Sequence, residues 1–313
     1  MHILISSYYL DLSGTPTYTL TLRDELAKRG YDVTIYSPAG GALAGTQPNN
    51  TAVRLITGAA HNLEGMEAPD IIIAQANTCA VSLRDAFPGT PLIFSAHGVT
   101  PPLEQPPPFE ADWYTAINED VMENLVGQGV QAGKIDIVRD FVNTERFCPV
   151  KPLHPTLERV LFISNFKKWT TYYTIDGACR RVGAALRAVG APYGRSYEIE
   201  KDINEADLVI STGRGVLEAM ACGRPTVSFN QVCGDGYLTS DVYMESRTRN
   251  FAGDRCRHKF DVDGLAGELA KYNPVDGATN RVLAIEHHGH GQGVDRILGT
   301  IGRTMRGRGL WAH

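Results

Sequence analysis

Residues 206–230 read ADLVISTGRGVLEAMACGRPTVSFN, and this stretch decides the fold. It predicts a strand over LVIS, a glycine loop, a short helix over VLEAMAC and a second strand over PTVSFN. A continuous apolar run of strand length precedes residues of high helix propensity. Gly213 and Gly215 permit backbone angles that other residues avoid. Gly223 ends the helix, and Pro225 prevents its continuation.

A strand, loop and helix in this order form a site for an anion. The first amides of a helix have no partner within the helix, so we expect Gly213, Arg214, Gly215 and Val216 to face a phosphate beyond the strand. Glu218 follows in the first turn or so, and its carboxylate can accept two hydrogen bonds from the paired hydroxyls of a ribose. The alternative is structural, because the helix dipole favours a glutamate near the N-terminus and glycines allow tight packing.

Strand-like and helical patterns alternate along the rest of the chain. This alternation predicts an α/β fold with parallel sheets covered by helices. A chain of 313 residues exceeds what one apolar core usually supports. The proline-rich residues 148–159 read as a linker, so we predict one domain over 1–150 and a smaller one over 151–313. Ligands commonly bind in a cleft between two such domains.

Several element ends can also be read from the sequence. Thr15 is expected to cap the first helix, with Gly30 just beyond its end. Asn118 is expected to cap a helix that starts at Glu119. Further expectations are a helix over 177–190, a strand over 196–200, an irregular loop over 101–108, and helices near 262–272, 281–287 and 293–306.

Composition limits the classes of partner. The formal charge of −5 and the lack of a long basic run argue against nucleic acid as the main partner. Arg303, Arg306 and Arg308 form a basic tail, for which a solvated end is favoured over peripheral contact with anionic membrane lipids. The first residues have no signal-peptide pattern, and no apolar run approaches membrane-spanning length. A soluble, cytoplasmic protein is therefore expected.

Cysteine and histidine usage gives no metal signature. The cysteines show neither paired spacing nor a CxxC pattern, and all six are interpreted as reduced thiols: Cys79, Cys148, Cys179, Cys222, Cys233 and Cys256. The cluster of His287, His288 and His290 lacks the spacing of a zinc site and is interpreted as a solvated helix end.

Two further candidate sites lie at the carboxyl ends of strands predicted in the first half of the chain. Gly14 and Thr15 lie between the first strand and the first helix, where their amides could face an acceptor or a phosphate. A glycine required only by the turn is the alternative. His97 ends the strand PLIFSAH at the carboxyl edge of the sheet, where open α/β folds bind ligands. Taken alone, a histidine in that position is more often a hydrogen-bonded structural residue.

Several ordered motifs resemble the retaining glycosyltransferases of family 4, also called group 1. Residues 213–230 resemble their donor-nucleotide segment, in which a glutamate is followed by Ala, a small apolar residue, Ala, another residue, Gly and Pro. Residues 111–149 resemble the stretch that closes their N-terminal domain. Residues 13–38 resemble their first helix and second strand. Together the motifs cover most of the chain, least strongly in the middle of the second domain.

The resemblance implies the GT-B fold, with two Rossmann-like domains whose parallel sheets face each other across a cleft. It implies that Glu218 holds the ribose of the nucleotide and that His97 lies against the transferred sugar. The implied reaction moves a sugar from a UDP or GDP donor to a hydroxyl of a glycan, lipid or small-molecule acceptor, with retention and without a metal. No enzymic nucleophile is assigned, because the leaving phosphate assists a front-face attack in this family. The nucleotide sugar is a co-substrate, and no other cofactor is expected.

The sequence departs from the family at the diphosphate and sugar contacts. A departing diphosphate requires nearby positive charge, which Lys167 or Lys168 is expected to supply. Asn165 and the serine before it stand where relatives carry Gly-Arg, so the choice between the two lysines stays open. Ile210 occupies the position of the family's first glutamate. Either lysine is also consistent with a solvated loop.

Two other functional classes remain as alternatives. A non-catalytic homologue would bind a nucleotide sugar without turnover, as the missing Gly-Arg pair and first glutamate suggest. An epimerase or hydrolase of the same two-domain plan would act on the nucleotide sugar alone. A dehydrogenase is disfavoured, because no complete GxGxxG follows the first strand.

Overall fold

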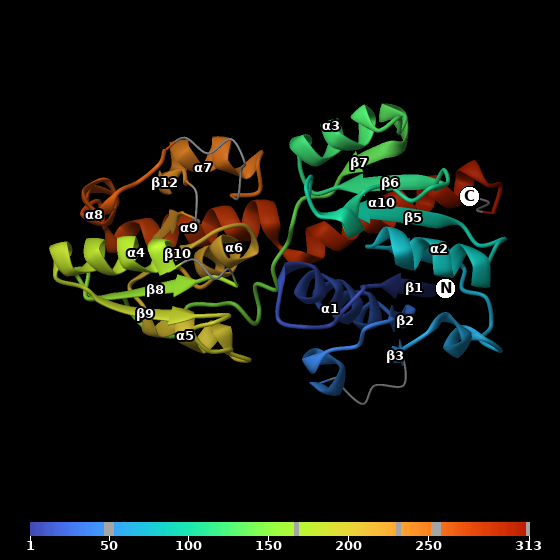
Figure 1. The fold of residues 1–313 in the computed structure, drawn as a ribbon, viewed down its shortest axis with the longest axis horizontal. Helices are drawn as coiled ribbons and strands as arrows, with labels where there is room; N and C mark the ends of the chain where they lie inside the picture. Colours follow the sequence, from blue (N-terminus) through green and yellow to red (C-terminus); the bar gives the residue numbers. More distant parts are fainter. Residues whose placement is uncertain (47–52, 166–168, 230–232, 252–257, 311–313) are drawn as a thin grey trace. The chain divides into compact units, whose positions relative to one another are not determined.

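The computed structural model describes residues 1–46, 53–165, 169–229, 233–251 and 258–310. The chain forms two compact α/β units (Figure 1). Unit 1 comprises Met1–Asp140 and His290–His313, and unit 2 comprises Phe141–Gly289. The predicted division at residue 150 differs from this one at two places. The chain enters unit 2 earlier than predicted, and its last helix returns to unit 1.

Unit 1 is built around a seven-stranded parallel sheet. Its strand order is β3-β2-β1-β4-β5-β6-β7. The strands are β1 His2–Ser6, β2 Asp32–Ser37, β3 Val53–Thr57, β4 Ile71–Ala74, β5 Leu92–Ala96, β6 Trp113–Ala116 and β7 Ile135–Ile137. The α-helices are α1 Gly14–Lys28, α2 Asn77–Ala86, α3 Glu119–Gly127 and α10 His290–Gly307. The order reverses between β1 and β4, which is where open α/β sheets leave a crevice at the carboxyl ends of their strands.

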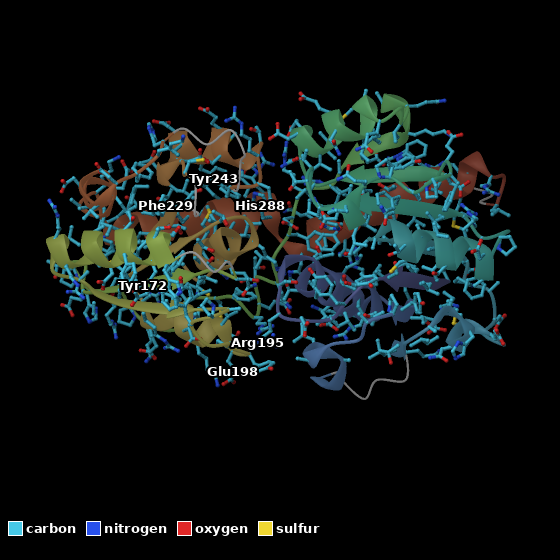
Figure 2. The ribbon with its side chains drawn as sticks, in the orientation of Figure 1. Tyr172, Arg195, Glu198, Phe229, Tyr243 and His288 are labelled. Atoms are coloured by element: carbon cyan, nitrogen blue, oxygen red, sulfur yellow. The ribbon has the colours of Figure 1, made fainter. Side chains whose placement is uncertain are left out.

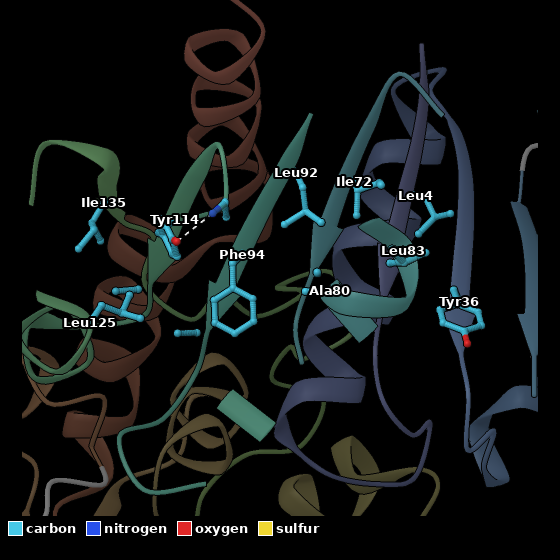
Figure 3. Packing of buried hydrophobic residues seen from close by; sticks show 14 of the residues in the cluster. Leu4, Tyr36, Ile72, Ala80, Leu83, Leu92, Phe94, Tyr114, Leu125 and Ile135 are labelled. Atoms are coloured by element: carbon cyan, nitrogen blue, oxygen red, sulfur yellow. Dashed lines mark hydrogen bonds between the residues drawn. The ribbon is translucent and has the colours of Figure 1, made fainter. Parts of the chain in front are cut away.

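The core of unit 1 lies between this sheet and its helices. Leu4, Ile72, Leu92 and Phe94 are fully buried on neighbouring strands (Figure 3). Tyr114 joins them with its ring, and its hydroxyl accepts a hydrogen bond from the backbone N–H of Ala111. Burial of each such apolar side chain contributes about 1.5–3 kcal/mol to the stability of the fold. This layer therefore holds β1, β4 and β5 in place.

The C-terminal helix α10 belongs to unit 1 because one of its faces is apolar. Val294, Ile297 and Ile301 are buried at helical spacing, and the helix contacts α1 and β5. Arg29, the C-cap residue of α1, donates to the Asp295 carboxylate, at 2.5 Å, and to the Gly291 carbonyl, at 2.9 Å. Proximity along the chain to unit 2 does not decide where a helix packs, and this explains the difference from the predicted boundary.

Unit 2 contains a five-stranded sheet in the order β12-β11-β10-β8-β9. All neighbouring strands are parallel except β11 and β12, which are antiparallel. The strands are β8 Arg159–Ile163, β9 Ala185–Val189, β10 Leu208–Ser211, β11 Thr226–Ser228 and β12 Gly236–Tyr237. The helices are α4 Trp169–Val182, α5 Ile199–Glu205, α6 Arg214–Ala221, α7 Ser240–Arg247, α8 Val262–Leu269 and α9 Pro274–His288. The order reverses between β8 and β10, so a second crevice is expected at their carboxyl ends.

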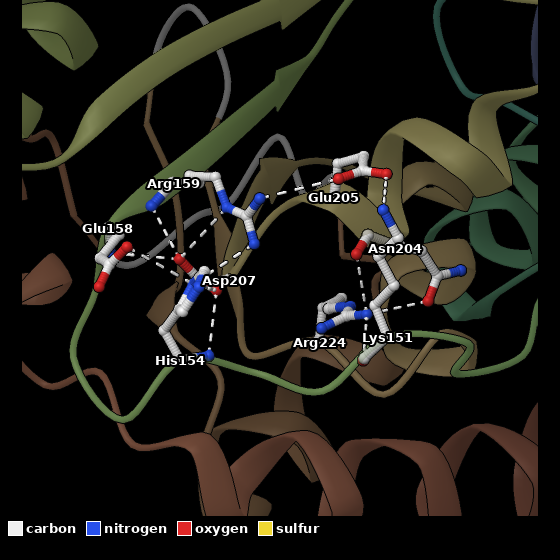
Figure 4. A network of polar contacts seen from close by, with 8 residues as sticks. All are labelled: Lys151, His154, Glu158, Arg159, Asn204, Glu205, Asp207 and Arg224. Carbon is white, nitrogen blue, oxygen red and sulfur yellow. Dashed lines mark hydrogen bonds and ion pairs between the residues drawn. The ribbon is translucent and has the colours of Figure 1, made fainter.

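Residues 148–159 are a packed part of unit 2, which corrects their interpretation as a linker. The fully buried Asp207 carboxylate accepts hydrogen bonds from the backbone N–H groups of His154, Glu158 and Arg159 (Figure 4). The buried Arg224 guanidinium donates to the Lys151 carbonyl at 2.8 Å. Proline-rich segments have few backbone donors of their own, so side chains of the unit provide their anchoring.

Several local expectations are confirmed, and others are wrong. Asn118 accepts a hydrogen bond from the Val121 N–H and caps α3 as predicted. The first helix begins one residue before Thr15, at Gly14, with Ser13 as its N-cap. Residues 177–190 were expected to be one helix, but Gly183, with a φ of 74°, ends α4 and the strand β9 follows. The strand expected over 196–200 does not form: residues 196–198 are irregular and α5 begins at Ile199, with Ile203 fully buried and Ile199 partly buried on one helical face.

The histidine cluster is not a solvated helix end. His288 is 2% exposed and lies near Tyr243 (Figure 2), with 6.2 Å between the two ring centroids. Its ring also packs against that of Phe251. His290 is buried in unit 1, with its Nε2 atom 3.5 Å from a carboxylate oxygen of Glu25. Helix α9 ends at His288 and α10 begins at His290, so the two histidines are buried in different units. Composition alone could not indicate that division.

Candidate functional site

The loop after β10 has the geometry that its glycines predict. Gly213 adopts φ 55° and ψ −129° and precedes the first residue of α6. A Cβ atom on Gly215 would lie 2.2 Å from Ser211 Oγ, which itself donates to the Ile163 carbonyl. Only glycine allows α6 to start this close to β10 and β8. The helix N-terminus therefore lies at the carboxyl ends of the two strands where the sheet order reverses.

Glu218 lies one turn into α6 and is 8% exposed. Its Oε1 atom accepts a hydrogen bond from Arg214 Nε at 3.0 Å, in an i,i+4 ion pair on the helix. Arg214 is equally buried, and its Nη1 atom donates to the Phe141 carbonyl at 2.8 Å. The Arg214 guanidinium is thus directed along the helix toward Glu218. A buried carboxylate paired in this way has a fixed position from which to accept ligand hydroxyls.

Val216 contributes to the core rather than offering a side chain to a ligand. It is fully buried in the main apolar cluster of unit 2. Its backbone N–H donates to the Gly213 carbonyl at 3.1 Å. The amide of Gly213 donates to the Phe251 carbonyl at 3.3 Å. These two amides therefore have backbone partners in this structure, in contrast to the expectation that they face a phosphate.

The loop after β8 lies beside the loop after β9. Asn165 is exposed, and its Oδ1 atom accepts a hydrogen bond from the Ala191 N–H at 3.4 Å. Gly190, with a φ of 101°, packs so closely that a Cβ atom would lie 2.1 Å from the Ser164 carbonyl oxygen. Asn165 is thus placed at the same sheet edge as α6. The two lysines expected to contact the diphosphate, Lys167 and Lys168, lie outside the described residues.

In unit 1, His97 follows β5 and is oriented by its neighbours. Its Nε2 atom lies 3.2 Å from Ser95 Oγ, which accepts a hydrogen bond from Thr115 Oγ1 at 2.9 Å. The Tyr18 ring of α1 contacts the imidazole edge to face, with 4.7 Å between centroids. The histidine is therefore a hydrogen-bonded residue at the sheet edge. This position agrees both with a ligand contact and with a purely structural role. Ser95 and Thr115 were not singled out in the sequence, although strand alternation places residues 95 and 97 on one side.

Gly14 and Thr15 begin α1 at the carboxyl end of β1. Gly14 is exposed and has open space where a side chain would be. The Ser13 side chain makes no capping hydrogen bond, and the first turn has no acidic residue. The Thr15 carbonyl accepts a hydrogen bond from Thr19 Oγ1 within the helix. The first turn of α1 is therefore accessible at Gly14, beside the switch point of the unit 1 sheet.

Glu104 is an acidic residue of this edge that the sequence did not reveal. It ends a short 3-10 turn, Pro102–Glu104, in the loop that was expected to be irregular. Its carboxylate accepts a hydrogen bond from the His97 backbone N–H. Burial, with the nearby charge of Asp140, raises the pKa of Glu104 from 4.5 to about 7, although the hydrogen bond from His97 opposes this shift. Nothing in the spacing of residues 101–108 indicates that the loop folds back onto His97.

This raised pKa predicts a pH-dependent stability that Glu104→Gln should remove. A carboxyl group that holds its proton more tightly when folded stabilises the protein below pH 4.5, and this contribution is lost as pH rises through about 7. The variant should therefore gain stability over the natural chain between these values, by at most on the order of 3 kcal/mol. Urea unfolding at a series of pH values measures the difference. A difference that stays constant from pH 4 to 8 would contradict the assignment.

Among the described residues, no group of three or more His, Cys, Asp and Glu side chains is placed to hold a metal ion. Within the same residues, no helix has both the length and the apolar character needed to cross a bilayer.

Cys233 is disulfide-bonded, so the interpretation of all six cysteines as reduced is wrong for this residue. Pairing through space leaves no spacing signature in the sequence. The thiols of Cys79, Cys148, Cys179 and Cys222 are free, and Cys256 lies outside the described residues.

Comparison with known proteins gives a family match for part of the chain and a fold for most of it. Residues 12–146 match Glycosyltransferase Family 4. No curated protein sequence matches the chain. HepE of Anabaena, solved in complex with UDP and glucose, is 15% identical with a TM-score of 0.68, over 97% of this chain and 100% of that one. A glycosyltransferase from Rickettsia africae is 15% identical with a TM-score of 0.67, over 97% and 98% of the two chains.

A third similar structure is an α-glucosyltransferase in complex with UDP and a 13-mer DNA. It is 12% identical with a TM-score of 0.68, over 96% of this chain and 99% of that one. At these identities the likeness establishes the fold, and it extends over both units. The chain has the GT-B fold of these glycosyltransferases, and its residues 12–146 match the model of Glycosyltransferase Family 4.

Proposed function

We propose that this protein is a glycosyltransferase that transfers a sugar, with retention, from a UDP-sugar to an acceptor hydroxyl. The observation that carries the proposal is the buried carboxylate of Glu218, which Arg214 holds one turn beyond the glycine loop of β10. Carboxylate oxygens suit the paired hydroxyls of a ribose. The choice of UDP over GDP is supported by HepE, which was solved with UDP and with UDP-glucose. In this proposal Glu218 binds the ribose of the donor.

The other site residues act on the diphosphate and the sugar. Asn165 and the α6 N-terminus lie at one sheet edge of unit 2, where a helix end favours an anion. In unit 1, Gly14 opens the first turn of α1, and His97 is held by Ser95 and Tyr18 for contact with the sugar or acceptor. Lys167 or Lys168 supplies positive charge to the departing diphosphate.

The proposed reaction exchanges one bond at the anomeric carbon. A bond forms from the acceptor oxygen to that carbon while the bond from the carbon to the diphosphate oxygen breaks. The acceptor proton passes to the departing phosphate, and the products are UDP and the new glycoside. The enzyme lowers the barrier by placing the reactants and by stabilising charge that grows on the phosphate oxygens. A metal is not required for this proposal.

Calorimetry and product analysis with the purified chain test the proposal. UDP and UDP-glucose should bind, GDP should bind more weakly, and EDTA should leave binding unchanged. Absence of binding to UDP and to every UDP-sugar would overturn the proposal. UDP release that requires an added glycan acceptor, with an α-linked product by NMR from an α-linked donor, would support retaining transfer. Release of free sugar or of an epimer without acceptor would identify a hydrolase or epimerase, and binding without turnover a non-catalytic homologue.

A further inference from the structure

Arg214 donates charge-assisted hydrogen bonds to a side chain and to a backbone carbonyl of unit 2. Its Nε atom donates to Glu218 Oε1 at 3.0 Å, and its Nη1 atom donates to the Phe141 carbonyl oxygen at 2.8 Å. The arginine side chain is 7% exposed and the glutamate side chain is 10% exposed. Arg214 is the first residue of α6, so it starts at the helix N-terminus, where a diphosphate is proposed, and extends toward the carboxylate one turn later.

These contacts constrain the Glu218 side chain. A glutamate loses appreciable rotamer entropy when it is ordered, so an unsupported one would meet a ligand in many orientations. The guanidinium is planar and presents its donors in a fixed fork, which suits it to hold two acceptors at once. Because the Phe141 carbonyl is a backbone group at the first residue of unit 2, it gives the fork a second fixed anchor. Arg214 therefore fixes the position of Glu218 Oε1.

We propose that Arg214 is a positioning residue of the donor site. It orients the Glu218 carboxylate for the ribose hydroxyls and does not contact the diphosphate. This inference rests on the proposed ribose contact of Glu218. It assigns Arg214 a role different from the phosphate contact that its place in the glycine loop suggests. It also makes ribose recognition depend on a residue that touches no part of the nucleotide.

Two nucleotides separate the two roles of Arg214. UDP and 2′,3′-dideoxyuridine 5′-diphosphate carry the same base and diphosphate, but only UDP has the ribose hydroxyls. Arg214→Met should weaken UDP binding about tenfold and leave binding of the dideoxy nucleotide unchanged within about twofold, since a hydrogen-bond loss near 1.4 kcal/mol is tenfold. A direct phosphate contact predicts equal weakening for both nucleotides, and this result would overturn the proposal.

A double-mutant cycle gives the second test. In the Glu218→Gln background, Arg214→Met should cause less than about a twofold further loss of UDP affinity, because residues that act through one contact are non-additive. Arg214→Lys keeps the charge but lacks the fork, so it should recover only part of the UDP affinity. Arg180→Met is the matched control, since that arginine is 79% exposed on α4 and should not change binding. A tenfold further loss in the Gln background would contradict a role through Glu218.

The same variants distinguish a folding defect, a failure of the proposed function and a failure of the role proposed for Arg214. Arg214→Met removes the arginine that is paired with a buried carboxylate, whereas the double variant removes both charges, so thermal unfolding is measured for each. If the natural chain binds neither nucleotide, the proposed function fails. If the natural chain binds both equally, the ribose role of Glu218 fails. If Glu218→Gln abolishes the preference for UDP while Arg214→Met preserves it, only the role of Arg214 fails.

Discussion

Asp207→Ala is expected to lower the free energy of unfolding by about 3–5 kcal/mol, because it removes a fully buried carboxylate that accepts several hydrogen bonds. Asp207 is 0% exposed and precedes β10. Its Oδ1 atom lies 2.9 Å from His154 Nδ1, and its Oδ2 atom accepts from the Arg159 N–H at 2.8 Å. Removing the carboxylate takes the acceptor away from these part-buried donors. Urea unfolding followed by tryptophan fluorescence measures the loss.

The same carboxylate sets a dependence on pH. Burial opposes its ionisation, but hydrogen bonds from the backbone and side chain of His154 and the backbone of Arg159 lower the pKa of Asp207 below 3.8. Its stabilising contribution is therefore present above pH 3.8 and is lost as pH falls through the lower folded value. Asp85→Ala, at an exposed position of α2, is the control and should change stability by less than about 0.5 kcal/mol. A loss below about 1 kcal/mol for Asp207→Ala would contradict its anchoring role.

Glu218→Gln is expected to weaken UDP binding roughly 10- to 150-fold. A hydrogen bond to a charged group contributes about 1.5–3 kcal/mol, and glutamine keeps the shape of the side chain while removing its charge. The effect should appear in the affinity and in KM for the donor more than in kcat, because the ribose lies away from the reacting carbon. Calorimetry with UDP and steady-state kinetics with UDP-glucose measure the two effects.

Two comparisons restrict the interpretation of that variant. Glu286→Gln, at an exposed position of α9, should bind UDP as the natural chain does. Glu218→Gln should also show a native melting transition, since a misfolded α6 would weaken binding for another reason. Unchanged UDP affinity in the folded variant would reject the ribose contact.

Local patterns predicted the strand, loop and helix around Glu218 because these three elements follow one another directly in the sequence. The positive φ of Gly213 and the close packing of Gly215 follow from their place between β10 and α6. The pairing of Arg214 with Glu218 follows the i,i+4 spacing of a helix, although this spacing was not used to predict the site. Its second contact, with Phe141, joins residues 73 positions apart and has no local signal.

The residues around His97 show why the rest of the site was not predicted. Thr115 reaches Ser95 only because β6 pairs with β5 in the register that places them opposite each other. Glu104 approaches His97 because the proline-rich loop turns back at a 3-10 turn. Strand order, register and loop path depend on the whole fold, whereas composition and periodicity report only on short segments.

The return of the last helix to the first unit makes that unit discontinuous in sequence. A fragment ending near residue 150 would keep every strand of the seven-stranded sheet and lose the cover that Val294, Ile297 and Ile301 provide. Such a fragment would expose the apolar surface that these three side chains cover, and we expect it to self-associate. The second unit is an uninterrupted insertion, so excising 141–289 and joining 140 to 290 with a short glycine-serine bridge is the rational way to divide the protein.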